Sequence, residues 1–341
     1  MKTSLTQRLL SRDNALPMFL LRVLLAPLQV LYMAVVTTRN ALYDTGLLSG
    51  EAAGAPVISV GNLTVGGTGK TPLVIELARR ALAKGRKVAI VTRGYGAVAD
   101  DAGRSDEAAL IAERVPQATL IISPDKLTGA RQAASEGADV ILVDDGFQHR
   151  RLQRDLDIVV ADARAPFGNG YQLPVGGMRE SPSAMARADV VVLTHTEGLD
   201  KFKLHDSKAS IQAQNRGVPM VLGTHRPLGV RSVTEQTLSP LSDLMGRDVF
   251  LFCGIGSPEG FQITVESLGA VVTGLMPFPD HHAFSGTDLA EVRSQARTAR
   301  LLCTEKDAAK VARLAGNDDV LCLVIDMELV GELPALPGID G

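Results

Sequence analysis

Residues 59–71, which read SVGNLTVGGTGKT, carry the clearest chemical signal in the chain. Glycines let backbone N–H groups approach anionic oxygens closely, and the N-terminus of a following helix adds a favourable dipole. In such a loop Lys70 would reach the β- and γ-phosphates of a nucleotide, and Thr71 would ligate Mg²⁺. The loop departs from the pattern GxxxxGK[ST] only at Thr64, where the first glycine would fall. The alternative is a glycine-rich turn with an incidental lysine. We predict a nucleotide site formed by Thr64, Val65, Gly66, Gly67, Thr68, Gly69, Lys70 and Thr71.

A second chemical signal ends an apolar run, where Val140–Val143 is followed by Asp144 and Asp145. A carboxylate at the end of a parallel strand beside a phosphate loop is a common Mg²⁺ ligand. An ordinary strand-ending Asp-Gly turn is the alternative, but the upstream loop favours the metal site. Gln148 and His149 follow at the rim where open α/β sheets bind ligands. We expect the nucleotide to be ATP, because the sequence has neither a guanine-reading [NT]KxD motif nor the protein-kinase motifs.

The composition excludes several classes of protein. A length of 341 residues suggests two domains or one large α/β unit. With 45% hydrophobic and 21% charged residues, the chain is neither disordered nor fibrous. A net charge of -3, 4% aromatic residues and no tryptophan argue against nucleic-acid binding. The three cysteines lie apart in apolar runs, which is typical of buried thiols in a reducing compartment.

The elements that must position these residues alternate along the chain after Arg39. Apolar runs bounded by Gly and Asp alternate with helical runs, which predicts a mostly parallel sheet with helices on both faces. The alternation restarts beyond Pro227 and predicts a second, smaller α/β lobe. The boundary is expected within Arg226–Ser239, a polar stretch without a clear period. The predicted parts are a membrane-associated segment at 1–38, a core at 39–227 and a C-terminal α/β lobe at 228–341.

The segment Ala15–Val36 breaks the soluble pattern, because it is apolar and long enough to cross a bilayer. A spanning helix and a buried core helix are both possible for it, whereas a signal peptide lacks a cleavage site. Arg22, Gln29, Pro17 and Pro27 would be costly at bilayer depth and tolerable at the interface. We expect a helix lying in the interface, with Arg22 extending to the headgroups.

Seven short motifs occur in order along most of the chain. They are SVGNLTVGGTGKTP at 59–72, TRGYG at 92–96, SDE at 105–107, VDDGFQH at 143–149, FGNGYQLPVGGMRE at 167–180, FPDHH at 278–282 and TEKDAAK at 304–310. Together they resemble the tetraacyldisaccharide 4′-kinase family, the lipid A 4′-kinases of Gram-negative bacteria. The resemblance implies a P-loop NTPase-like fold at the cytoplasmic face of the inner membrane. It also implies transfer of a phosphate from ATP to the 4′-hydroxyl of tetraacyldisaccharide 1-phosphate, which forms lipid IVA.

The resemblance also implies roles for individual residues. Asp106 matches the catalytic carboxylate and His281 the histidine that pairs with it; in isolation, Asp106 would be interpreted as a solvated acid at a helix N-terminus. Lys70 completes the expected catalytic set. The expected Mg²⁺ ligands are Thr71, Asp144, Asp145 and Glu180. The expected substrate contacts are Tyr95, Glu107, Gln148, His149 and Arg179.

Two other functions use similar loops. A regulatory or partitioning ATPase would carry a lysine just before the glycine pair, where this chain has Val65. A membrane-tethered nucleotide-binding module would show no turnover. The favoured hypothesis is a monomeric kinase that uses ATP and Mg²⁺, contacts a membrane surface, acts on a glycolipid and binds no nucleic acid.

Overall fold

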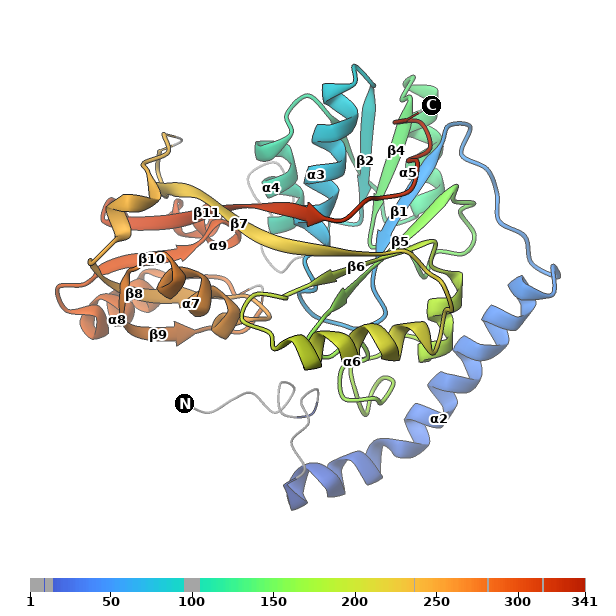
Figure 1. Cartoon of the computed structure of the whole chain (residues 1–341), viewed down its shortest axis with the longest axis horizontal. Coiled ribbons are helices and arrows are strands. Elements are labelled where there is room, and N and C mark those ends of the chain that lie inside the picture. Colours follow the sequence, from blue (N-terminus) through green and yellow to red (C-terminus); the bar gives the residue numbers. More distant parts are fainter. Residues whose placement is uncertain are drawn as a thin grey trace.

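The computed structural model describes residues 9, 15–94, 105–235, 237–280, 282–314 and 316–340. Its strands are β1 (Val57–Gly61), β2 (Val88–Thr92), β3 (Thr119–Ile122), β4 (Val140–Asp144), β5 (Leu156–Asp162), β6 (Val190–Thr194), β7 (Met220–Ser232), β8 (Asp248–Cys253), β9 (Val271–Pro277), β10 (Arg300–Thr304) and β11 (Val320–Val330). They form one sheet in the order β3-β2-β4-β1-β5-β6-β7-β11-β10-β8-β9 (Figure 1). The β7–β11 pair is antiparallel and the other pairs are parallel. The predicted mostly parallel α/β fold is therefore confirmed.

Helices cover both faces of the first half of this sheet, as buried parallel strands require. Successive strand residues point to opposite faces, so Ile58 packs with one helical layer and Val57 with the other. One face carries α3 (Lys70–Ala83) and α4 (Asp106–Arg114); the other carries α5 (Lys126–Ser135), the 3-10 helix η1 (Pro182–Arg187) and α6 (Lys201–Gln212).

The second half of the sheet repeats this layering on a smaller scale. Phe252 and Cys303 pack beneath one pair of helices, whereas Leu251 and Cys253 pack beneath a single helix on the other face. The pair of helices over Phe252 is α8 (Gly286–Ala296) and α9 (Glu305–Val311). The helix over Leu251 is α7 (Pro258–Ser267), and the 3-10 helix η2 (Leu241–Leu244) packs on the same face as α7.

The long antiparallel strands β7 and β11 join the two halves, with pairing that runs from Leu321–Ser232 to Val330–Leu222. The expected boundary between residues 227 and 228 falls inside β7, so the sheet continues across it. The polar stretch there forms a strand because its backbone pairs with β11, and many of its side chains stay partly exposed; β6 pairs only with residues 220–222 of β7. The division into a core and a lobe stays a prediction.

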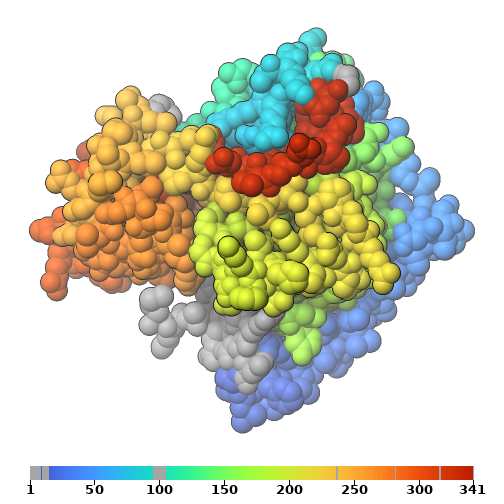
Figure 2. All heavy atoms as spheres, viewed as in Figure 1, coloured from blue at the N-terminus to red at the C-terminus, as the bar shows by residue number. Residues whose placement is uncertain are grey.

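Residues 333–340 return from β11 to the first half of the molecule. Leu336 and Ile339 are buried in the same core as Leu73 and Leu77 of α3. Figure 2 shows this red segment lying against the cyan atoms of the first half. The segment was expected in the C-terminal lobe, but its apolar side chains pack in the core of the other half.

Helix α2 (Leu16–Asp44) extends along one side of the molecule (Figure 1). It continues through Pro27 and beyond Val36, and only Met18 and Arg22 along it are buried. Among the described residues it is the one helix long and apolar enough to cross a membrane. Its exposure excludes the buried core helix, and its apolar surface suits association with a membrane. The exposed large apolar residues of α2 are Leu16, Phe19, Leu20, Val23, Leu24, Leu28, Val30, Leu31, Met33 and Val35.

Candidate active site

The loop between β1 and α3 has the backbone of a phosphate-binding loop. Gly66 (φ 112°) and Gly69 (φ 84°) lie in the left-handed region that side chains other than glycine rarely adopt. Gly69 is also the N-cap of α3, so Lys70 and Thr71 begin the helix. The amide N–H groups and the dipole of this helix N-terminus favour an anion.

Two side chains hold this loop in place. The Nδ2 of Asn62 donates to the carbonyl oxygen of Thr64 at 2.5 Å and to the Oγ1 of Thr68 at 3.1 Å. The Oγ1 of Thr194, at the end of β6, donates to the carbonyl oxygen of Thr68 at 2.8 Å. The loop is thus fixed to the carboxyl end of β6 as well as to its own strand.

Two residues at the start of the phosphate loop, Thr64 and Val65, contact the 171–178 segment. The N–H of Val65 donates to the carbonyl oxygen of Gly177 at 2.7 Å, and Thr64 forms a β-bridge with Met178. These two residues therefore anchor the loop to the 171–178 segment, and the amide of Val65 is engaged away from a nucleotide. The six residues from Gly66 to Thr71 line the cavity described next.

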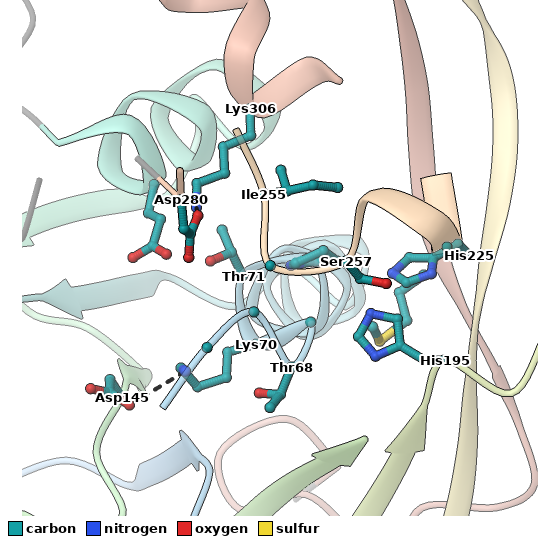
Figure 3. A pocket seen from close by; sticks show the side chains of 18 of the residues that line it. Thr68, Lys70, Thr71, Asp145, His195, His225, Ile255, Ser257, Asp280 and Lys306 are labelled. Atoms are coloured by element: carbon teal, nitrogen blue, oxygen red, sulfur yellow. Dashed lines mark hydrogen bonds and ion pairs between the residues drawn. The ribbon is translucent and has the colours of Figure 1, made fainter. Parts of the chain in front are cut away.

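A cavity of about 740 Å³ lies among the phosphate loop, α2 and the second half of the sheet. This volume is in the range of about 300–1,000 Å³ that is usual for small-molecule sites. In Figure 3, Lys70 points towards Asp145, whereas Thr71 lies on the side of Asp280 and Lys306. The lining also includes Tyr32, Val36 and Arg39 from α2, and Ile255, Gly256 and Ser257 from the loop after β8.

Asp145 lies beside two cations, Lys70 and Arg179. The Nζ of Lys70 lies 3.6 Å from Oδ1 of Asp145 (Figure 3). One terminal nitrogen of Arg179 donates to both carboxylate oxygens, at 2.8 and 2.7 Å. Burial alone would raise the pKa of Asp145, but Lys70 and Arg179 together hold that pKa below its ordinary value. Asp145 is therefore an ionised carboxylate between two cations that could each hold a phosphate.

Asp144 is more deeply buried than Asp145 and lies at the end of β4, in register with Val60 of β1. Its Oδ2 accepts a hydrogen bond of 3.4 Å from the Oγ1 of Thr92, and its buried Oδ1 has no hydrogen-bond partner among the described residues. Burial, with a smaller effect from the charge of Glu107, raises the pKa of Asp144 to about 6. A buried carboxylate oxygen with an unused lone pair fits the chemistry of a cation ligand.

Two further groups near the carboxylates are partly desolvated. Lys126 is almost fully buried, and its Nζ donates to the carbonyl oxygen of Val91 at 3.2 Å. Burial lowers the pKa of Lys126 to about 8, against the attraction of Asp144. Burial also lowers the pKa of His149 to about 4, so this lining residue is neutral at physiological pH. Gln148, the other predicted rim residue, donates from Nε2 to the carbonyl oxygen of Asn62 at 2.9 Å.

Asp106 begins α4, next to an N-cap serine, Ser105. Its Oδ2 lies 2.7 Å from the Nζ of Lys310, which comes from the second half of the sheet. Glu107 lines the cavity, whereas Asp106 lies just outside the lining. Tyr95 and His281, the remaining predicted residues, lie outside the described residues.

Glu180 belongs to a separate buried cluster. Its Oε2 accepts a hydrogen bond of 2.7 Å from Nδ2 of Asn40 and an ion pair of 2.8 Å from Arg187, and its Oε1 lies 3.4 Å from Arg39. Glu180 is fully buried and is not part of the cavity lining. Its contacts with Asn40 and Arg39 link α2 to the core.

We expect Glu180→Gln to lower the thermal midpoint of unfolding markedly, because it leaves Arg187 and Arg39 without their anionic partner. Breaking a buried pair in this way typically costs about 3 kcal/mol or more. Glu51→Gln is the matched control, since Glu51 also pairs with two arginines but at the surface. Differential scanning calorimetry measures both. An unchanged midpoint with weakened Mg²⁺ dependence would instead support the expected role of Glu180 as a metal ligand.

The cavity is also lined by polar groups beyond the phosphate loop, near the end of β6, that no sequence motif predicts. His195 pairs through Nδ1 with Asp162 at 3.2 Å, and Glu197 accepts the backbone N–H of His225 at 2.5 Å. The two imidazole rings lie 5.4 Å apart (Figure 3). His195 and Glu197 follow directly after β6, so polar residues at this strand end were the available signal. His225 arrives from β7, the unpredicted strand.

Comparisons with known proteins identify the family to which this chain is similar. The family model described as tetraacyldisaccharide-1-P 4′-kinase matches residues 21–336. The tetraacyldisaccharide 4′-kinase of an Anaeromyxobacter species is 41% identical over 329 residues, covering 90% of this chain and 88% of the relative. That of Geobacter metallireducens is 34% identical over 341 residues, covering 94% and 98%.

A solved structure extends this agreement to three dimensions. The crystal structure of LpxK from Aquifex aeolicus in complex with ATP superposes with a TM-score of 0.70 at 30% sequence identity. The match covers 91% of this chain and 95% of that one. The resemblance inferred from the seven motifs is confirmed, and the chain belongs to the tetraacyldisaccharide 4′-kinase family.

Proposed function

We propose that the chain transfers the γ-phosphate of ATP to the 4′-hydroxyl of a tetraacylated glucosamine disaccharide 1-phosphate, and so forms lipid IVA. One observation carries this assignment: a single cavity is lined both by the phosphate loop and by α2, the exposed apolar helix. A nucleotide and the sugar end of an acylated lipid can therefore meet in it. Since one chain supplies both the phosphate loop and the apolar helix, we propose that the protein acts as a monomer.

The nucleotide would lie along the cavity from the phosphate loop towards β6. The amides of Gly66–Gly69 and the ammonium of Lys70 would hold the β- and γ-phosphates. The base would extend towards His195 and His225, the polar groups beyond the loop. The ATP in the related LpxK structure supports this choice of nucleotide.

The residues around Asp144 fit a Mg²⁺ ion. Asp144 offers a buried oxygen without a hydrogen-bond partner, and Thr71 and Asp145 both line the cavity nearby. Mg²⁺ takes few protein ligands and completes its coordination with phosphates and water. When bound, Mg²⁺ neutralises phosphate charge and orients the transferred group. Glu180 remains the fourth proposed ligand, although its oxygens contact Asn40, Arg39 and Arg187 in this structure.

The transfer itself needs the acceptor oxygen to be oriented and its proton accepted. As that oxygen bonds to the γ-phosphorus and the bond to the β–γ bridging oxygen breaks, the hydroxyl proton would pass to the carboxylate of Asp106. Lys70 would stabilise the charge that develops on the phosphates. We propose that His281 pairs with Asp106, as in the family. The proposed substrate contacts remain Tyr95, Glu107, Gln148, His149 and Arg179.

The test is an incubation of the purified chain with ATP, Mg²⁺ and tetraacyldisaccharide 1-phosphate in detergent micelles. We expect a product heavier by one phosphoryl group and ADP in equal amount. An acceptor already phosphorylated at the 4′ position is the control and should release no ADP. ADP release that is independent of the acceptor would overturn the proposal in favour of an ATPase.

We also propose that α2 lies in the cytoplasmic leaflet of the inner membrane. Its exposed apolar side chains support the contact, and its proximity to the cavity would bring the active site to a lipid whose acyl chains stay in the bilayer. ATP and Mg²⁺ are available on the cytoplasmic side. The three cysteines, Cys253, Cys303 and Cys322, are buried and unoxidised, which suits a reducing compartment.

Introducing Glu at Leu20, Leu24 and Leu31 together should abolish co-sedimentation with vesicles of phosphatidylethanolamine and phosphatidylglycerol. The three positions are exposed and spaced to share one face of α2, and charges there would have to enter the apolar region. Phe202→Glu is the matched control, because Phe202 is a highly exposed apolar residue on α6. Sedimentation of the triple variant like wild type would contradict a membrane contact through α2.

A further inference from the structure

Lys310 is a buried cation that the chemistry described so far does not use. Its Nζ lies 2.7 Å from Oδ2 of Asp106, and both side chains are only about one-twentieth exposed. Asp106 begins α4 in the first half of the sheet, and Lys310 lies in α9 in the second. The proposed catalytic carboxylate is therefore held by a residue from the opposite half.

Lys310 also lies near a second carboxylate, that of Asp307, which two hydrogen bonds hold in place. Asp307, one turn earlier in α9, lies 3.8 Å from the Nζ of Lys310. The other oxygen of Asp307 accepts the N–H of Gly254 at 2.9 Å and the Oγ1–H of Thr304 at 2.7 Å. A chain of contacts thus runs from the β8 loop through α9 to Asp106.

Such an arrangement does two things for Asp106. A neighbouring cation favours the ionised form of a buried carboxylate, and a short ion pair restricts its side-chain rotation. Phosphoryl transfer depends mainly on the position of the attacking hydroxyl and less on the strength of the base. What matters for the transfer is therefore the orientation that Asp106 gains beside Lys310.

We infer, resting on the function proposed above, that Lys310 is a positioning residue for phosphoryl transfer, which holds Asp106 ionised and directed at the acceptor hydroxyl. The competing explanation is a purely structural link between α4 and α9. The chain offers a control for it, because Glu113 at the other end of α4 pairs with the buried Arg231 of β7 at 2.6 Å. Glu113→Gln breaks a comparable link without touching Asp106.

The test measures kcat and KM for both substrates, with the thermal midpoint of each variant. We expect Lys310→Met to lower kcat by about 30- to 100-fold while each KM changes by less than about threefold, since the lost interaction acts in the transition state. Lys310→Arg should recover kcat to within about fivefold of wild type, because it restores the cation. Glu113→Gln should lose stability and keep its kcat.

A double variant distinguishes a failure of this inference from a failure of the proposed function. If Lys310 acts through Asp106, adding Lys310→Met to Asp106→Asn should cause no further loss of kcat. A multiplicative loss in the double variant, or a Lys310→Met enzyme with wild-type kcat, overturns the inference. Wild-type kcat in Asp106→Asn would instead remove the proposed role of Asp106. If Lys310→Met does not fold, Lys310→Gln, which keeps a hydrogen-bond donor, replaces it, with an expected loss of at least about tenfold.

Discussion

Lys70→Ala should lower kcat by about 10²–10³-fold, the usual loss when one charged or hydrogen-bonding group aimed at the transition state is removed. Lys70 is the cation that begins α3 at the phosphate loop, and its present partner Asp145 keeps a second cation in Arg179. The loss should therefore appear in turnover rather than in folding. Initial rates of ADP and lipid product formation, with saturating ATP and acceptor, measure it.

Lys84→Ala is the matched control for this prediction. Lys84 follows the last turn of α3, is half exposed and pairs with Asp340 far from the cavity. The same change in side chain there should leave kcat unaltered. If Lys70→Ala turned over like the Lys84→Ala enzyme, the phosphate-loop assignment would have to be abandoned.

Asp106→Asn is expected to lower kcat by about 10²–10⁴-fold, the span usual for a group that accepts a proton in the transition state. The amide has nearly the same shape but cannot accept the hydroxyl proton, and it leaves Lys310 without an anionic partner. Because Asp106 lies outside the cavity lining, the affinity for ATP should stay close to that of wild type. Equilibrium binding of ATP and steady-state kinetics separate the two effects.

Asp125→Asn provides the control for Asp106→Asn. Asp125 is the N-cap of α5, where its side chain accepts the N–H of Leu127, and asparagine is as good a cap as aspartate. That variant should keep both stability and kcat. A kcat for Asp106→Asn within about twofold of this control would exclude Asp106 from the proton transfer.

Local signals in the sequence were enough to predict the first half of the fold and the centre of the site. The glycines before Lys70 and the apolar run that ends at Asp144 each specify a strand and the turn after it. In a parallel sheet both turns fall on the same edge, because β1 pairs with β4.

The missed features depend on contacts between distant segments. Strand β7 shows no apolar alternation, and most of its length is held as a strand by pairing with β11, a segment about 100 residues later in the chain. Its His225 and the loop that carries Ser257 therefore could not be assigned to the cavity. The buried partners of Glu180 come from α2 and η1, far away in sequence. No local pattern in the sequence predicts these contacts of Glu180.

The return of residues 333–340 to the first half of the sheet bears on how the chain matures during synthesis. Leu336 and Ile339 complete the core beneath α3, so that core keeps an open apolar surface until this segment has left the ribosome. The nucleotide-binding half, although synthesised first, therefore finishes folding last, after the intervening strands β8 to β11 have been made. Until then the apolar surface of α2 and the incomplete core are both exposed to solvent, and each could cause aggregation. Early binding of α2 to a bilayer would cover the first of these two surfaces.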